Sequence, residues 1–271
     1  MARAEGFIDR ERARALMKSA GVDALVAWGG QNFHYASGFQ NYFDNPGASI
    51  AVLPVDGQPF LIVAEWVVDA ARESSWIDEL HTFPLWLEIL DGDNLDRAPV
   101  ERPVRYDLAA NVRLLATVLA GRGLSASRLA IERSSISAAA FDALGEALPS
   151  ATWVDATPLF FELRSRKHPD EIRLIERATR YAEHGLLALA RADLTGADVG
   201  RLRSLYEQAC VERALAERDA GFQGVRVTAA VAGDISPRLS GGAQAAQGDL
   251  IFFDCGALVE GYGSDTGRTL S

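Results

Sequence analysis

One stretch near the end of the sequence, Gly248 to Thr269, constrains the fold more than any other part of the chain. Its apolar run from Leu250 to Phe253 is too short for a helix and is rich in aromatic and β-branched residues, which indicates a strand covered on both faces. Turn-forming glycines follow, and the chain then runs out again from Thr266 to Leu270. The stretch therefore predicts two strands joined by a tight turn, with Gly256, Gly261 and Gly263 between them.

The position of the turn decides which side chains face each other. A turn centred between Val259 and Glu260 would place Asp254 directly opposite Asp265. Opposed side chains in an antiparallel pair have Cβ atoms roughly 5 Å apart, and like charges there are destabilising. A protonated pair would relieve the repulsion, but a pair of metal ions about 3.5 to 4 Å apart would make the arrangement useful. Two alternatives stay open: one Asp is simply solvated near the turn, or a bulge at Gly256 breaks the register.

Several residue types in this stretch occur together in a known pattern: Gly248-Asp249, Asp254-Cys255-Gly256, Gly261-Tyr262-Gly263-Ser264-Asp265 and Arg268-Thr269. The pattern resembles the first metal-binding hairpin of the "pita-bread" metallopeptidases. That family includes Xaa-Pro dipeptidase (prolidase), aminopeptidase P, methionine aminopeptidase and creatinase. The resemblance implies that Asp254 and Asp265 are ligands of a dinuclear centre of Mn, Co, Zn or Fe.

Two further segments resemble parts of the same family. Asn32 to Phe39 resembles a signature near the start of prolidase and creatinase N-terminal domains, and Leu163 to Ile172 resembles the junction that opens the catalytic domain. We therefore place a boundary near Pro158. The resemblance implies a creatinase/prolidase-type N-terminal domain over residues 1–158 and the first half of a pita-bread metallopeptidase domain over residues 159–271.

Hydrophobic periodicity gives the same division. The N-terminal part alternates helices with strands, which is typical of an α/β layer domain. Its expected helices are Arg10 to Ala20, Trp66 to Glu73, Asp107 to Val118 and Ser137 to Ala147, and its expected strands are Ala24 to Trp28, Ser49 to Pro54, Pro59 to Val63, Arg128 to Glu132 and Thr152 to Asp155. Two helices, Pro169 to Ala192 and one that begins with the capping-box pattern Thr195-Gly196-Ala197-Asp198, then precede a strand over Val225 to Val231. The expected fold class is an α/β N-terminal domain followed by part of an α+β pita-bread domain.

Composition limits the partners and the compartment. Hydrophobic residues make up 48% and charged residues 24% of the chain, as in an ordinary soluble globular protein. A net charge of −10 argues against nucleic acid or an anionic membrane as the main partner. Met1 to Arg14 has no signal-peptide core, and no apolar run reaches the roughly 20 residues of a membrane span. With only Cys210 and Cys255, disulfides are not expected, so we expect a cytoplasmic protein.

The resembling family completes its metal site with one His and two Glu that follow the hairpin. All of the histidines here precede it, at His34, His81, His168 and His184. We interpret His168 as a helix-start residue and His184 as a partly exposed one, and neither as a ligand. Because two Asp alone bind a transition metal weakly, we expect the chain as given to lack the downstream ligands and a working centre.

The stretch before the hairpin also departs from the family, whose members carry a substrate-contacting His there. Arg238 stands nearest to that place. An Arg could bind a substrate carboxylate through two parallel hydrogen bonds, but it cannot act as a general acid at neutral pH. A surface Arg in a loop is the alternative. Gly267 stands where many members have Thr, which removes one supporting hydroxyl.

Other catalytic patterns are not supported. Ser264 lacks the Gly-x-Ser-x-Gly context of a serine hydrolase, and Gly241-Gly242 lacks the Lys-Ser/Thr of a phosphate loop. Cys255 follows an apolar strand and is expected to be a buried structural thiol. No catalytic residue is assigned.

The resemblance implies a metal-dependent hydrolase of the Xaa-Pro dipeptidase type. It would cleave the C–N bond of a small peptide with a metal-activated water, and family members often form homodimers. A creatinase-like, metal-free hydrolase of a small amide or guanidino compound is one alternative. A non-catalytic or incomplete fragment is the other.

Overall fold

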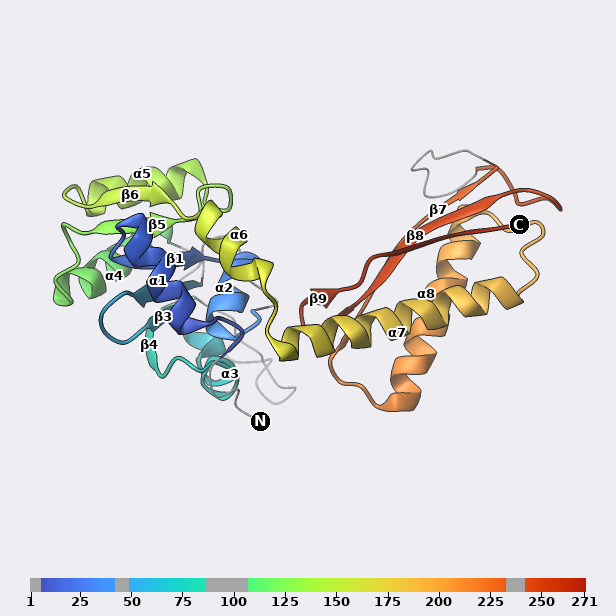
Figure 1. Ribbon diagram of the computed structural model, residues 1–271, viewed down its shortest axis with the longest axis horizontal. Helices are drawn as coiled ribbons and strands as arrows, with labels where there is room; N and C mark the ends of the chain where they lie inside the picture. The colour runs from blue at the N-terminus through green and yellow to red at the C-terminus, as the bar shows by residue number, and fades with distance from the viewer. Residues whose placement is uncertain (1–5, 42–48, 86–106, 233–241) are drawn as a thin grey trace, which may run out of the picture. The chain divides into compact units, whose positions relative to one another are not determined.

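The computed structural model describes residues 6–41, 49–85, 107–232 and 242–271 (Figure 1). It contains two compact units, Met1–His168 and Pro169–Ser271. Pro158, near which the sequence places a boundary, lies inside α6 (Thr157–Ser165). This helix belongs to the first unit, because the guanidinium of Arg12 donates to the backbone carbonyls of Glu162 and Leu163 at 2.6 and 3.2 Å.

The first unit is built on one six-stranded sheet. Its strands in spatial order are β4 (Glu79–Phe83), β3 (Phe60–Ala64), β2 (Ile50–Pro54), β1 (Ala24–Trp28), β5 (Arg128–Ile131) and β6 (Thr152–Asp155). β1, β5 and β6 are parallel, whereas β2 is antiparallel to both of its neighbours. β2 and β3, both expected from the sequence, form a hairpin through Asp56-Gly57, with Gly57 at φ 111°.

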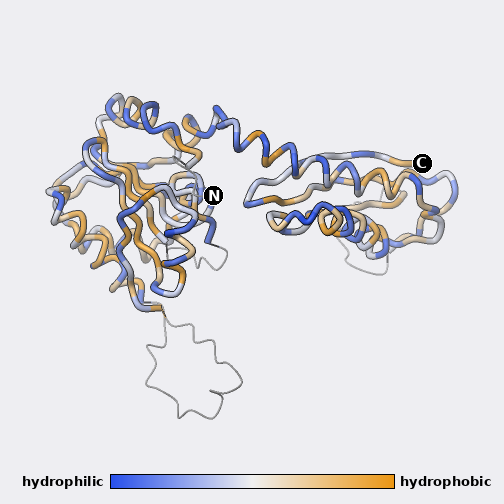
Figure 2. Tube along the Cα trace, turned by 90° about the horizontal axis from the view of Figure 1, so that it is seen from below, coloured by the Kyte–Doolittle hydropathy of each residue, from blue (hydrophilic) through white to orange (hydrophobic). Residues whose placement is uncertain are grey.

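Both faces of this sheet are covered in its centre, since every residue of β1, β2 and β3 is buried. Figure 2 shows hydrophobic stretches running through the middle of this unit. The helices and the short 3₁₀ turn that surround the sheet, besides α6, are α1 (Arg10–Ala20), α2 (Gly30–Ser37), η1 (Glu65–Val67), α3 (Val68–Ser74), α4 (Leu108–Gly121) and α5 (Ala138–Ala147).

The expected helix starts are confirmed by their caps. The side chains of Asp9, Asp107 and Ser137 accept hydrogen bonds from backbone N–H groups three residues later. Gly21 ends α1 in the left-handed conformation with φ 63°. The structure adds α2, α6 and β4, which the periodicity does not predict.

The second unit packs two helices against one face of an antiparallel sheet. The helices are α7 (Pro169–Arg191) and α8 (Val199–Glu217), and the strands are β7 (Phe222–Val231), β8 (Ile251–Val259), β9 (Tyr262–Gly263) and β10 (Thr266–Leu270). β8 lies between β10 and β7 and also pairs with β9. α7 contacts β8, β9 and β10, and α8 contacts α7 and β7 (Figure 1).

The core of this unit lies between the helices and the sheet. It includes Leu202, Tyr206 and Cys210 of α8 and Phe253 and Cys255 of β8. The two helices meet closely at Gly185 of α7, where an added Cβ atom would lie 2.6 Å from the Tyr206 ring. Among the described residues, no helix of either unit is long and apolar enough to cross a membrane.

Candidate metal centre

Strand β8 separates two chemical environments by simple alternation. Its odd-numbered residues, from Ile251 to Val259, are buried against α7 and α8. Its even-numbered residues point to the opposite face of the sheet, where Phe252 is 44% and Leu258 is 38% exposed. The prediction of a strand covered on both faces is therefore wrong within this unit. We call this second side, which carries Asp254, the open face.

A two-residue turn joins β8 to β9. Glu260 and Gly261 both have positive φ angles, 45° and 80°, as a type I′ turn requires. Val259 consequently pairs with Tyr262. The turn is therefore centred between Glu260 and Gly261, one residue later than the sequence suggests.

This shift of the turn changes the partner of Asp254. Gly267 of β10 lies opposite it on one side and Thr228 of β7 on the other. The prediction that Asp265 lies directly opposite Asp254 is wrong, because moving the turn centre by one residue moves the opposing strand by two. Thr266 pairs with Cys255, whose side chain is buried among the helices, so the preceding Asp265 belongs to the open face.

The two carboxylates thus lie on the same face as diagonal neighbours. Diagonal neighbours in an antiparallel pair are roughly 7 to 8 Å apart, which reduces the repulsion expected for direct opposition. Asp254 is half-buried, whereas the side chain of Asp265 is 78% exposed. Within the described residues, the Asp254 carboxylate has neither a hydrogen-bond nor an ion-pair partner.

Asp265 is paired with a cationic side chain. Nη2 of Arg226 in β7 lies 3.0 Å from Oδ1 of Asp265. Arg226 stands opposite Gly256 of β8, so its side chain crosses β8 to reach the far segment. Strand parity places Arg226, Thr228, Asp254 and Asp265 together on the open face. The sequence alone did not single out Arg226, because its position depends on the register.

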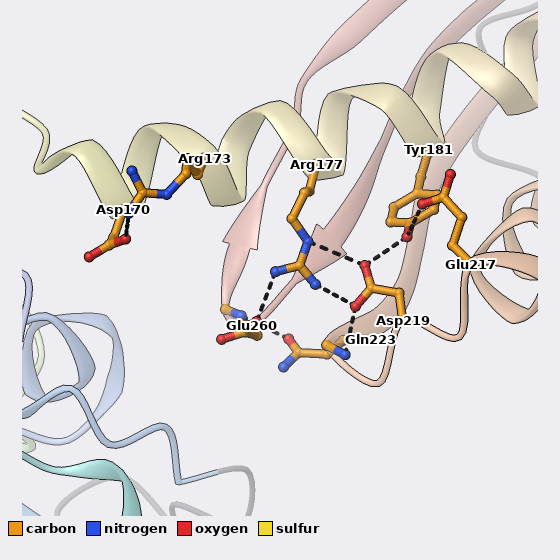
Figure 3. Close-up of polar contacts among 10 residues, drawn as sticks. Asp170, Arg173, Arg177, Tyr181, Glu217, Asp219, Gln223 and Glu260 are labelled. Carbon is orange, nitrogen blue, oxygen red and sulfur yellow. Dashed lines mark hydrogen bonds and ion pairs between the residues drawn. The ribbon is translucent and has the colours of Figure 1, made fainter. Parts of the chain in front are cut away.

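A polar cluster holds the turn of this hairpin against α7 (Figure 3). Arg177 donates to Glu260 at 3.0 Å and to both carboxylate oxygens of Asp219, while Tyr181 contacts Asp219 at 2.7 Å. Burial acts to raise the pKa of Asp219, but the hydrogen bonds from Tyr181 and Arg177 outweigh it and hold that pKa below its ordinary value. The cluster holds the turn from the helix side of the sheet. None of its side chains lies on the open face.

Both cysteines lie on the covered side and are buried. Burial raises the pKa of Cys210 to about 11 and also raises the pKa of Cys255. The expectation that Cys255 is a buried structural thiol is confirmed, since a protonated, inaccessible sulfur is a poor nucleophile.

Within the described residues, no third metal-ligating side chain joins the two aspartates. Across these ranges, no group of three or more His, Cys, Asp and Glu side chains could hold a metal ion. His168 is exposed just before α7, and His184 is half-buried within it. Arg238, the predicted substrate contact, lies outside the described residues.

Comparison with known proteins shows the family to which this chain belongs. Residues 10–166 match the family model described as "Creatinase/Prolidase N-terminal domain". The chain belongs to the creatinase/prolidase family. It is 26% identical over 267 residues to the Bacillus subtilis protein named "Putative dipeptidase YkvY", in a match that covers 96% of this chain and 65% of that protein. The resemblance seen in the sequence is therefore confirmed.

Solved structures of the family share the fold. The Xaa-Pro dipeptidase from Bacillus anthracis has a TM-score of 0.73 at 17% identity, covering 97% of this chain and 64% of that one. Dipeptidase PepE from Mycobacterium ulcerans has a TM-score of 0.69 at 23% identity, covering 97% and 63%. The predicted fold class, an α/β N-terminal domain followed by part of a pita-bread domain, is confirmed. The chain spans just under two thirds of the length of these relatives.

Proposed function

We propose that the protein is a metal-dependent hydrolase of the Xaa-Pro dipeptidase type, acting on the peptide bond of a small peptide. The observation that carries this proposal is the presence of Asp254 and Asp265 on one open sheet face in a chain of the creatinase/prolidase family. The dipeptidase names of its relatives support a small peptide as the substrate.

The two carboxylates suit the cofactor that the family resemblance implies, which is a pair of divalent ions of Mn, Co, Zn or Fe. Carboxylate oxygens are hard donors of the kind such divalent ions accept. Asp265 forms an exposed ion pair with Arg226. Asp254 has no hydrogen-bond or ion-pair partner among the described residues. Neither carboxylate therefore takes part in a buried structural contact. We propose that both are ligands, and that they form only part of the complete ligand set.

When bound, such ions lower the pKa of water towards neutrality and polarise a carbonyl oxygen. The chain itself would contribute the placement. Strand β8 and the segment before β10 present Asp254 and Asp265 towards solvent, while the packed opposite face and the Arg177 cluster hold the hairpin rigid. Rigid strands suit this role, because a metal site tolerates only small displacements of its ligands.

Several finer expectations stay proposals. Arg238 would bind the carboxylate of the substrate. We retain the division into an N-terminal domain and half of a pita-bread domain, with the boundary after α6 and not near Pro158. We also retain a homodimeric assembly and a cytoplasmic location.

Metal removal and replacement test the proposed function. The protein expressed in and purified from its native host, stripped with EDTA, should not hydrolyse Ala-Pro or Ala-Ala, and Mn²⁺ should restore hydrolysis. Asp254→Asn should lower the restored kcat/KM by roughly 100-fold or more, because a ligand is lost. Glu183→Gln removes the same charge from an exposed position on α7 and serves as the control.

Hydrolysis by protein shown to be metal-free would favour the creatinase-like alternative. Hydrolysis that is absent at every metal concentration would favour a non-catalytic role. Equal activity of Asp254→Asn and Glu183→Gln would remove Asp254 from the ligand set.

A further inference from the structure

Two hydroxyl groups in the core of the second unit have no hydrogen-bond partner within the described residues. One belongs to Tyr206 of α8, which is 0% exposed. The other is Oγ1 of Thr266 in β10, a buried atom of a half-buried residue. Buried polar groups are nearly always hydrogen-bonded, either to protein or to ordered water, because an unpaired group costs free energy. These two hydroxyls therefore need a partner.

Both hydroxyls lie beside the side chain of Cys255. Thr266 stands directly opposite Cys255 in the β8–β10 pair, and opposed side chains have Cβ atoms roughly 5 Å apart. The hydroxyl of Tyr206 interacts with the thiols of Cys255 and Cys210, although neither contact has the geometry of a hydrogen bond. One place between α8, β8 and β10 thus contains both hydroxyls.

The two thiols do not supply the missing hydrogen bonds. The thiol of Cys210 donates to the backbone carbonyl of Tyr181 at 3.2 Å, and the thiol of Cys255 donates to the backbone carbonyl of Thr266 at 3.4 Å. Each thiol has a single proton, which is used in this contact. Burial raises the pKa of both thiols, so both keep that proton. Only the weak acceptor capacity of sulfur is left for a neighbouring hydroxyl.

We propose that one water molecule is bound beside Cys255 and links the hydroxyls of Tyr206 and Thr266. A buried water typically makes about three hydrogen bonds to polar groups that lack another partner. The Tyr206 hydroxyl donates to this water, the water donates to Oγ1 of Thr266, and its second proton points towards sulfur.

The bound water would join α8 to β10. Among the described strands, β10 pairs with β8 alone, so it is an edge strand of the sheet. A water-mediated contact is nearly as favourable as a direct hydrogen bond. It would hold the strand that directly follows Asp265 from the covered side of the sheet. This inference does not depend on the proposed function, because it concerns only the packed core.

Oxygen-17 magnetic relaxation dispersion of the full chain tests the inference directly, because it counts the water molecules that stay bound longer than the protein takes to rotate. The double variant Tyr206→Phe/Thr266→Val should hold one long-lived water fewer than the wild type. Thr269→Val makes the same change at an exposed position of β10 and should hold the same number as the wild type. An unchanged number in the double variant would overturn the inference.

Urea denaturation gives a second test, in which the sign of the effect decides. With the water bound, Tyr206→Phe and Thr266→Val each remove a hydrogen bond and should lower the midpoint of unfolding. Because both hydroxyls bind the same water, the double variant should lose less than the sum of the two single losses. Thr269→Val corrects for the higher strand propensity of valine.

Two results in urea would overturn the inference. If the hydroxyls were buried without any partner, removing either one would raise the midpoint of unfolding. Strictly additive losses would mean that Tyr206 and Thr266 do not share one water.

Discussion

The two sheets of this molecule use their faces differently. In the first unit, every residue of β1, β2 and β3 is buried, so both faces of the sheet serve packing. In the second unit, β8 buries its odd-numbered residues and presents its even-numbered residues on the open face. The comparison teaches that side chains able to carry chemistry collect where one face of a sheet is left uncovered.

The physical reason lies in the cost of burying charge. A carboxylate or guanidinium taken out of water loses several kcal/mol of solvation unless it finds a partner. The closed centre of the first sheet accordingly contains no charged residue in β1, β2 or β3. The second sheet can place Asp265 and Arg226 in solvent and Asp254 half-exposed on its open face, and still pack its other face against α7 and α8.

The sharpest way to break this comparison is to truncate two neighbours in β8. Phe253 is fully buried against the helices, whereas Phe252 is 44% exposed on the open face. Phe253→Ala should lower the free energy of unfolding by about 3 to 5 kcal/mol, because it removes a ring from a packed core. Phe252→Ala should change it by less than about 1 kcal/mol. Urea denaturation followed by far-ultraviolet circular dichroism measures both values.

Equal losses for the two variants would contradict the alternation. They would mean that the open face is covered in the protein in solution, for example by another part of the molecule or by a second copy. The two substitutions remove the same atoms, so each is the control for the other.

The same experiment on two neighbouring residues of the first sheet should give two large losses of stability instead of one. Leu25 and Val26 are neighbours in β1, point to opposite faces and are both 0% exposed. Leu25→Ala and Val26→Ala should each lower the free energy of unfolding, by about 2 to 5 kcal/mol for the leucine and somewhat less for the smaller valine.

Tryptophan fluorescence reports this change selectively. All five tryptophans of the sequence lie within Met1–His168, at Trp28, Trp66, Trp76, Trp86 and Trp153. A urea transition detected by fluorescence therefore follows the first unit. If one of the two β1 variants were as stable as the wild type, one face of this sheet would be free of packing demands and the contrast with β8 would disappear.

The sequence was sufficient to predict those features that depend on contacts between residues close together in the chain. Asp9 and Gly21 bracket α1, and Asp107 and Ser137 begin α4 and α5, because each cap satisfies backbone groups only a few residues away. The Asp56-Gly57 turn between β2 and β3 is of the same kind. The combination of residue types in the second hairpin also sufficed to indicate the family.

The register of that hairpin could not be read in the same way. Glu260 adopts a left-handed conformation that non-glycine residues seldom take, so the pair Glu260-Gly261 gives a weaker turn signal than Asn-Gly. The Arg177 cluster that holds Glu260 joins residues from α7, the end of α8 and the turn, and such long-range contacts leave no pattern in the sequence. The pairing of Arg226 with Asp265 follows from the register and was missed with it.

The prediction with the smallest expected effect concerns the Arg177 cluster. This cluster holds the β8–β9 turn in place in a sheet that is packed on one face only. Arg177→Met retains the apolar stem and removes the donors to Asp219 and Glu260. We expect the free energy of unfolding to fall by about 1 to 3 kcal/mol at pH 7, because the side chain of Asp219 is only 10% exposed and hydrogen bonds to charged groups are comparatively strong.

The loss should depend on pH in a defined direction. The pKa of Asp219 is lowered in the folded state, so its interactions stabilise the fold fully above the unfolded pKa of about 4 and are lost as the pH falls through the lowered folded value. The difference in unfolding free energy between wild type and Arg177→Met should therefore shrink below about pH 4. Arg173→Met is the control, since Arg173 pairs with Asp170 at an exposed position on the same helix (Figure 3) and its loss should cost less than about 1 kcal/mol. A difference between wild type and Arg177→Met that stays constant from pH 7 to pH 3 would mean that Arg177 acts through packing and not through the charge of Asp219.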